Sequence, residues 1–320
     1  MPMDFLRSSR SSYSSSEYRI THRVVPDDPE LILVAVQGLW AHPDYTWEKN
    51  GVSWLSQFLP QDIPGLLVTT FGPSKSPTER SGWVLKIASN LLRTSFLPTL
   101  LAGLLARAWR KLLLIYALTL GTTVSLAWMD KYVTNLSTTR GDDIEQLANG
   151  LLADLDRLPR HLPIVLLGHS LGGLIVKQAF VSASQRSSHE QLVPRLRGLI
   201  FLGTPHSGAP LARLLSLSTF DSSFALISAL QVNSRYLEEL DRLFRQVVPP
   251  DRLFPRVVSV FEERRGMFFV RTVGQESASL SGYRAESLDT NHSQLVKFSR
   301  RDDPNYQKLL AAIKYCAGQI

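Results

Sequence analysis

A serine between two glycines marks the stretch of this sequence best suited to chemistry. Gly168 to Gly172 reads Gly-His-Ser-Leu-Gly, which fits the pattern G-x-S-x-G. An apolar run precedes the pattern and a helix-like run follows it, so the serine is expected on a sharp strand-to-helix turn where only glycine fits at the two flanking positions. The pattern predicts Ser170 as a nucleophile. The N–H group of Leu171, at the helix N-terminus, is expected to face the developing oxyanion.

The predicted nucleophile needs a base, because a serine hydroxyl at its ordinary pKa reacts poorly without an imidazole oriented by a carboxylate. In proteins with this turn the chain order is serine, acid, histidine. Of the later histidines, His189 lies in a polar connection and His206 precedes every candidate acid. His292 lies in a polar loop before the closing helix and is the predicted base. His169 adjoins the nucleophile, and we expect it to be structural.

The acid is expected at the end of a late strand. Glu262 and Glu263 both follow the apolar run "RVVSVF", and Glu276 and Asp289 are alternatives. We favour Glu262 and leave the others open.

The second oxyanion donor is expected in the loop after the apolar run Leu31 to Val36. There Gly38 precedes Leu39, whose N–H group is the predicted donor. This mechanism needs no metal or organic cofactor, and the histidines and carboxylates show no ligand spacing such as H-E-x-x-H.

Strand-like and helix-like runs alternate along the chain, which predicts an α/β protein with a mostly parallel sheet covered by helices on both faces. Continuous apolar runs are typical of central strands that are buried on both sides. The expected strands are 18–25 at an edge, 31–39, 65–72, 163–170, 196–206, 254–263 and 268–273, and the expected helices are 142–158, 171–183 and 305–319.

One apolar segment, 83–130, interrupts this alternation and is predicted to be a helical insertion. Within it, residues 112–129 carry no charge, and the run reaches the lower limit of about 17–25 residues for a membrane-spanning helix. Two interpretations stay open: membrane association through residues 94–129, or a helical excursion packed on the domain. In the first interpretation the protein is membrane-associated and faces the cytosol. In the second it is cytoplasmic.

Composition limits the remaining classes. The 320 residues suit one large domain, and the net charge of +7 is spread along the chain without a nucleic-acid-binding motif, so no nucleic-acid partner is expected. The single cysteine, Cys316, excludes an intrachain disulfide and is expected to be buried in the closing helix. Residues 1–17, rich in Ser and Arg, are expected to form a disordered tail before a hydrolase domain over 18–320.

Five blocks carry a resemblance to a known family: "VAVQGLWAHPDYTW", "WLSQFLPQDIPG", "GHSLGGLIVKQA", "GLIFLGTPHSGAP" and "LDTNHSQLVKFSRRDDPNY". Together they resemble the fungal serine-esterase-type α/β-hydrolases, a lipase-like group related to the serine-active-site phospholipid-remodelling protein and to GPI inositol-deacylase. The resemblance covers roughly residues 18–82 and 135–312. It implies Ser170 as nucleophile and His292 as base. The family's aromatic-Glu strand end matches Phe261-Glu262 and so supports Glu262 as the acid.

The sequence departs from the family at two places. Gln37 stands where the family usually has His, which bears on substrate preference, and the apolar insertion is unusual. Fungal relatives often continue into NACHT and repeat modules. None follows here, so we expect a stand-alone hydrolase.

Three functions follow from these observations. The first is hydrolysis of a carboxylic ester of a small-molecule or lipid-like, apolar substrate through an acyl-enzyme and a Ser-His-Glu triad. Residues 209–246 are then a cap or covering helices. The second is acyl transfer, or hydrolysis of a secondary-metabolite (polyketide) ester or thioester by the same triad. The third is a non-catalytic membrane or signalling module.

Overall fold

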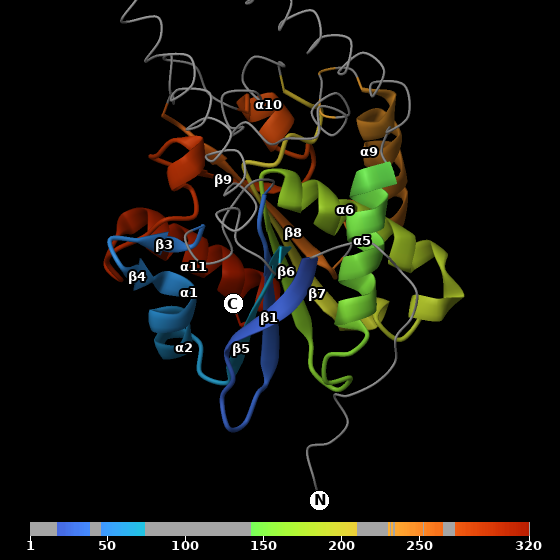
Figure 1. Cartoon of the computed structure of the whole chain (residues 1–320). Coiled ribbons are helices and arrows are strands. Elements are labelled where there is room, and N and C mark those ends of the chain that lie inside the picture. The colour runs from blue at the N-terminus through green and yellow to red at the C-terminus, as the bar shows by residue number, and fades with distance from the viewer. Residues whose placement is uncertain are drawn as a thin grey trace, which may run out of the picture.

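The computed structural model describes residues 18–38, 46–73, 142–209, 230, 232, 234–251, 253–264 and 273–319 (Figure 1). Several predictions from the sequence therefore lie outside the described residues. These are the tail 1–17, the donor Leu39, the insertion 83–130 with its membrane segment, and most of the region 209–246. Within the described ranges, no helix has the length and apolar character needed to cross a membrane.

The described chain forms a seven-stranded sheet with the strand order β1-β5-β2-β6-β7-β8-β9. Neighbouring strands pair in parallel, except that β1 pairs antiparallel with β5 at one edge. The strands are β1 (Tyr18–Val24), β2 (Leu31–Val36), β5 (Leu66–Pro73), β6 (Ile164–His169), β7 (Leu196–Leu202), β8 (Arg256–Glu262) and β9 (Arg284–Leu288). Two short strands, β3 (Glu48–Lys49) and β4 (Val52–Ser53), pair separately.

Helices cover both faces of the sheet, and each face has its own apolar core (Figure 1). On one face lie α5 (Asp142–Leu155), α6 (Leu171–Gln185) and α9 (Arg235–Val247). On the other lie α1 (Trp54–Gln57), α2 (Leu59–Asp62) and α11 (Pro304–Ala317), where Cys316 is buried. The short helices α10 (Gln275–Ala278), η1 (Ser187–His189), η2 (Val193–Arg195) and η4 (His292–Gln294) occupy connections.

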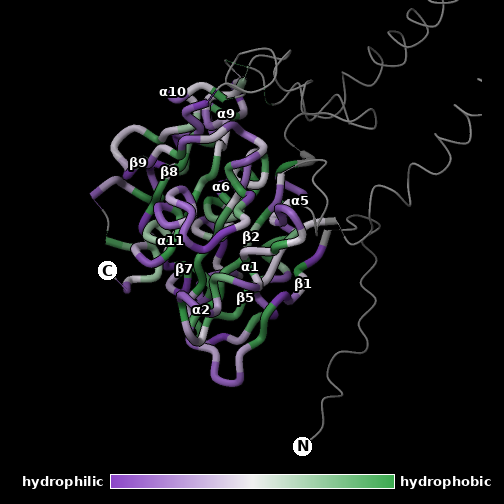
Figure 2. Tube along the Cα trace, turned by 90° about the vertical axis from the view of Figure 1, so that its left-hand side faces the viewer, coloured by the Kyte–Doolittle hydropathy of each residue, from purple (hydrophilic) through white to green (hydrophobic). Residues whose placement is uncertain are grey.

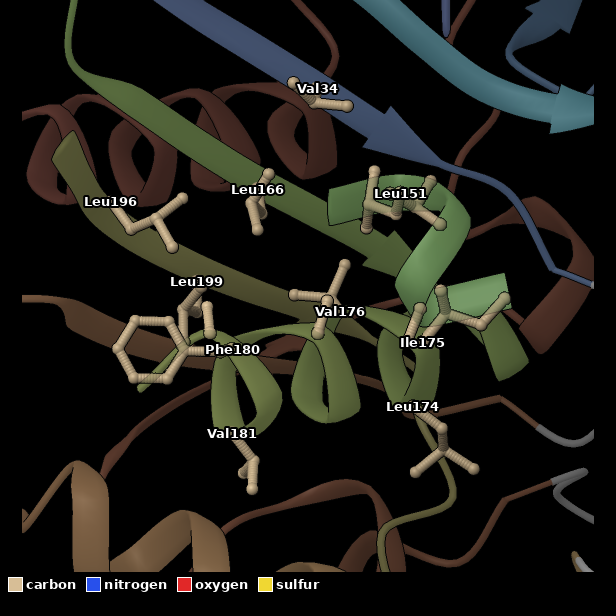
Figure 3. Close-up of a cluster of buried hydrophobic side chains, with 14 of the residues drawn as sticks. Val34, Leu151, Leu166, Leu174, Ile175, Val176, Phe180, Val181, Leu196 and Leu199 are labelled. Carbon is tan, nitrogen blue, oxygen red and sulfur yellow. The ribbon is translucent and has the colours of Figure 1, made fainter. Parts of the chain in front are cut away.

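The continuous apolar runs explain which strands are central. Every residue of β2 and of β6 is buried, as expected for strands covered on both sides. Figure 3 shows Val176 and Phe180 of α6 on the side of the helix that faces Leu166 and Leu199 of the strands. Figure 2 shows the same pattern along the chain, with hydrophobic stretches in the strands and hydrophilic stretches mainly on outer turns.

The sheet with its two helical layers, the antiparallel first strand and the turn between β6 and α6 together make an α/β-hydrolase fold, which confirms the predicted fold class. The last strand was not predicted. The expected strand 268–273 lies outside the described residues except for Val273, which is in no strand. Instead β9 pairs with β8, and its sequence, "RAESL", shows no apolar run because an edge strand keeps polar side chains.

Candidate active site

Ser170 lies on a strained turn between β6 and α6. Its φ of 53° and ψ of −125° lie outside the regions that residues with a side chain usually adopt, and such strain persists only where surrounding structure enforces it. The Ser170 N–H group donates to the carbonyl oxygen of Leu202 at 2.8 Å, which ties the turn to β7. The side chain is therefore presented at the carboxyl ends of the parallel strands.

Backbone packing around the turn leaves no room for side chains at the motif glycines. A Cβ atom at Gly172 would lie 2.4 Å from the carbonyl oxygen of Val36, and one at Gly168 would lie 2.5 Å from the Cα of Gly173. Both distances are well below van der Waals contact. The two glycines therefore let α6 approach β2 and turn directly out of β6.

The residues after β2 and the start of α6 lie beside the turn at Ser170. Gly38 lies against the turn, since a Cβ there would be 3.1 Å from the Cβ of Ser170. Leu171 is the first residue of α6, so its N–H group belongs to the unpaired first turn of a 15-residue helix. Gln37 is buried, and a Cβ at Gly72 would lie 2.5 Å from its Cδ, so its side chain lies over bare backbone of β5.

His292 and Glu262 meet in the interior above β8. The Nδ1 atom of His292 lies 3.5 Å from Oε1 of Glu262, and the side chains are 3% and 0% exposed. The same Oε1 atom accepts a hydrogen bond from the backbone N–H of Val273 at 3.0 Å, which orients the carboxylate. Burial of both partners favours a direct electrostatic interaction, because little water is present to screen it.

The other candidate acids lie at the surface. Glu263 accepts a hydrogen bond from the hydroxyl of Ser287 at the surface. Asp289 is paired with Arg264 at 2.6 Å, and this hydrogen bond lowers the pKa of Asp289. Glu276 is exposed in the first turn of α10. Only Glu262, among the four carboxylates considered from the sequence, is placed beside His292.

The histidines that were not predicted as the base have separate environments. His206 is buried with its ring against Phe201, and burial, followed by the charge of Lys177, lowers its pKa well below the ordinary value. His189 lies 2.9 Å from the Asp156 carboxylate, in η1 beyond the C-terminal end of α6, whereas Ser170 precedes the N-terminal end of that helix. His169 is buried with its ring packed against that of His292.

Gly203 is a site residue that the sequence did not single out. It has a φ of +56°, and a Cβ there would lie 2.9 Å from both Cε1 and Nδ1 of His292. The imidazole therefore rests on bare backbone at the end of β7. Its signal in the sequence is a glycine directly after an apolar strand, but the contact joins residues far apart in the chain.

Two cavities flank α10, with volumes of about 550 Å³ and about 700 Å³. Both are lined mainly by polar side chains, and Gln275 borders both. Within the described residues, no group of three or more His, Cys, Asp or Glu side chains is placed to hold a metal ion.

Comparison with curated proteins gives one recurrent relative, and no protein-family model matches the sequence. The chain is 29% identical to Protein SERAC1 of Bos taurus over 161 residues, which is 48% of this chain and 24% of that protein. It is 26% identical to Protein SERAC1 of Danio rerio over 162 residues. The chain thus covers about a quarter of the length of these relatives, and their organisms give no support to the fungal grouping.

Among solved structures, the chain is similar to the Bacillus licheniformis lipase BlEst2, with a TM-score of 0.49, 14% identity, and coverage of 92% of this chain and 99% of that one. It is also similar to the NocB thioesterase domain, with a TM-score of 0.42, 16% identity, and coverage of 94% and 100%.

Proposed function

We propose that this protein is a serine hydrolase that cleaves a carboxylic ester through an acyl-enzyme. The observation that carries the proposal is the combination of a serine on a strained strand-to-helix turn with a buried histidine–glutamate pair at the ends of neighbouring strands. A positive φ at a residue with a side chain costs free energy, and so does burial of a glutamate beside a histidine. Such costly features are concentrated at functional sites, so their occurrence together supports a catalytic role.

In the proposed first step, Ser170 Oγ attacks the ester carbonyl and its proton passes to Nε2 of His292. Glu262, facing Nδ1, stabilises the imidazolium that forms. The backbone N–H groups of Leu171 and Leu39 donate hydrogen bonds that stabilise the negative charge developing on the carbonyl oxygen. Each such donor contributes a factor of about 10²–10³ to the rate. The proton then goes to the leaving alcohol, which departs and leaves the acyl group on the serine oxygen.

In the second step, a water molecule gives one proton to His292 and its oxygen attacks the acyl carbonyl. The bond between Ser170 Oγ and the acyl carbon then breaks, His292 returns the proton to Ser170 Oγ, and the carboxylic acid departs. The proposed substrates are apolar or lipid-like esters, with the region 209–246 as a cap or acyl-binding wall. If an alcohol takes the place of water, the same intermediate makes the protein an acyltransferase. If the acyl group arrives on sulfur, it is a thioesterase.

The experiment is a rate measurement on p-nitrophenyl esters of increasing acyl length and on the matching acyl thioesters, with and without an added alcohol. The proposal expects ester cleavage by the wild-type chain and none by Ser170→Ala. A product ester formed only with alcohol present would instead favour transfer. Full activity in Ser170→Ala would contradict the whole assignment.

The proposal includes association with membranes through residues 94–129, within a single hydrolase domain over 18–320. Co-sedimentation of the full chain with phospholipid vesicles tests this part separately. Deletion of residues 94–129 is expected to abolish co-sedimentation while p-nitrophenyl acetate hydrolysis continues, and unchanged co-sedimentation would exclude the segment as the anchor.

A further inference from the structure

The imidazole of His292 is held by packing more than by hydrogen bonds. Neither of its ring nitrogens has a hydrogen-bond partner among the described residues, and its distance to Glu262 exceeds ordinary hydrogen-bond length. One side of the ring rests on the backbone at Gly203. Something must also fix the other side, because a base that rotates freely cannot stay within reach of a serine proton.

His169 supplies a second contact to this residue. The two imidazole rings pack with centroids 5.1 Å apart and an angle of 37° between their planes. In addition, His169 Nε2 lies 3.3 Å from the backbone carbonyl oxygen of His292, so an Nε2–H group can donate to it. The contact thus fixes both the ring and the backbone of the base residue.

The position of His169 in the chain makes this contact rigid. It is the last residue of β6 and the immediate neighbour of Ser170, and it pairs in register with Leu202 of β7. A Cβ at Gly38 would lie 3.2 Å from its carbonyl oxygen and 3.6 Å from its Nδ1. His169 therefore contacts three parts of the candidate site: the turn at Ser170, Gly38 after β2, and the loop that carries His292.

The charge state of His169 suits this place. Burial, followed by the charges of His292 and Lys297, lowers its pKa to about 3, so the ring is neutral near pH 7. A neutral ring donates one hydrogen bond and adds no positive charge next to an imidazole that must become protonated during the reaction. A cation at this position would oppose that protonation.

We propose that His169 is a positioning residue that couples the loop of His292 to the nucleophile turn, through its ring contact and its hydrogen bond to the His292 carbonyl. The inference rests on the proposed function, because it assigns His169 a role in the activity of Ser170 and His292. It concerns the second residue of the Gly-His-Ser motif, which directly precedes the proposed nucleophile.

The test compares two variants, one of which keeps the ring packing and the other the hydrogen bond to the His292 carbonyl oxygen. His169→Phe keeps a ring and loses the donor, whereas His169→Gln keeps an amide N–H that reaches the same carbonyl. We expect His169→Phe to lower kcat by about 10–100-fold with KM changed less than about twofold, and His169→Gln to recover most of that loss. His206→Phe is the matched control, since it also replaces a buried neutral histidine, on the side of Phe201.

The rate of serine labelling by a fluorophosphonate is measured on the same folded variants, with circular dichroism as the check on folding. Slow labelling of His169→Phe, with near-normal labelling of His169→Gln and His206→Phe, supports the inference. Labelling of His169→Phe as fast as wild type overturns it. Equal slowing in all three variants also overturns it, since loss of any buried histidine would then suffice. If wild type itself is not labelled, the proposed function fails instead.

Discussion

The two sides of the candidate site are built in different ways. The nucleophile side is defined by backbone: Ser170 sits in one strained conformation because Gly168 and Gly172 bring strand and helix within contact distance. The acid–base side is defined by side chains carried on loops and strand ends, where His292 and Glu262 are 3.5 Å apart. The comparison indicates that the backbone fixes the proposed nucleophile, whereas the position of the proposed base depends on several weak side-chain contacts.

Removing the base is expected to have the largest effect. His292→Ala should lower kcat by about 10⁴-fold, because the serine then has no proton acceptor. Steady-state hydrolysis of a p-nitrophenyl ester measures this, and His189→Ala is the control on a histidine remote from the turn. A loss below about tenfold would mean that another group takes the proton.

Replacing the acid comes next in size. Glu262→Gln keeps the shape of the side chain but removes the charge that stabilises the imidazolium, so kcat is expected to fall by about 10²–10³-fold. Glu263→Gln is the neighbouring control and should change kcat less than about twofold. A larger loss of kcat in Glu263→Gln than in Glu262→Gln would assign the acid to Glu263. The buried pair of His292 and Glu262 would then not be the acid–base side of the site.

A change on the nucleophile side tests the backbone argument. Gly172→Ala places a Cβ 2.4 Å from a carbonyl oxygen of β2, and neither group can rotate away. We expect about 1–3 kcal/mol lower free energy of unfolding in urea, together with at least tenfold slower ester hydrolysis. Gly318→Ala, at a positive φ but with open space around it, should lose stability without losing activity. Wild-type stability in Gly172→Ala would show that the turn is less tightly packed.

The smallest change is expected in stability alone, from Lys177 on the face of α6 that packs against α9. Lys177 is buried and paired with Asp241 of α9 at 2.7 Å, and burial lowers its pKa from 10.5 to about 8. Between these two values the unfolded chain binds more protons than the folded chain, so stability rises with pH. Relative to Lys177→Met, wild type should gain about 1–2 kcal/mol in unfolding free energy between pH 8 and 10.

Urea unfolding at several pH values measures that difference, and the labelling rate of the serine should stay the same in Lys177→Met. A flat difference across this pH range would mean that Lys177 keeps its ordinary pKa in the folded chain. A slower labelling rate would mean that the turn depends on the whole of α6, not only on its glycines.

The sequence predicts the parts of this molecule that depend on local order. The turn at Ser170 and the buried strands β2 and β6 each follow from contiguous residues, through the G-x-S-x-G pattern and continuous apolar runs. The edge strand β9 escaped prediction because polar side chains are tolerated there. Leu39 and the apolar insertion stay predictions, as they lie outside the described residues.

The acid–base side is harder to predict, because its contacts join residues that are distant in the chain. Chain order and its place in a polar loop before the closing helix selected His292, whereas Glu262 was favoured over Glu263, Glu276 and Asp289 without a residue contact to support the choice. The structure separates the two adjacent glutamates by strand alternation, since Glu262 continues the face of Val258 and Val260. The close packing of the His292 ring against the backbone of Gly203 cannot be predicted from neighbouring residues, because its only signal in the sequence is the glycine itself.

The most direct test of the central claim is covalent labelling of the full chain with a fluorophosphonate, followed by mass mapping of the labelled peptide. The account predicts one label per chain, on Ser170, with labelling at least 10²-fold slower in His292→Ala. A label on another residue, no label on the folded wild-type chain, or equally fast labelling of His292→Ala would contradict it.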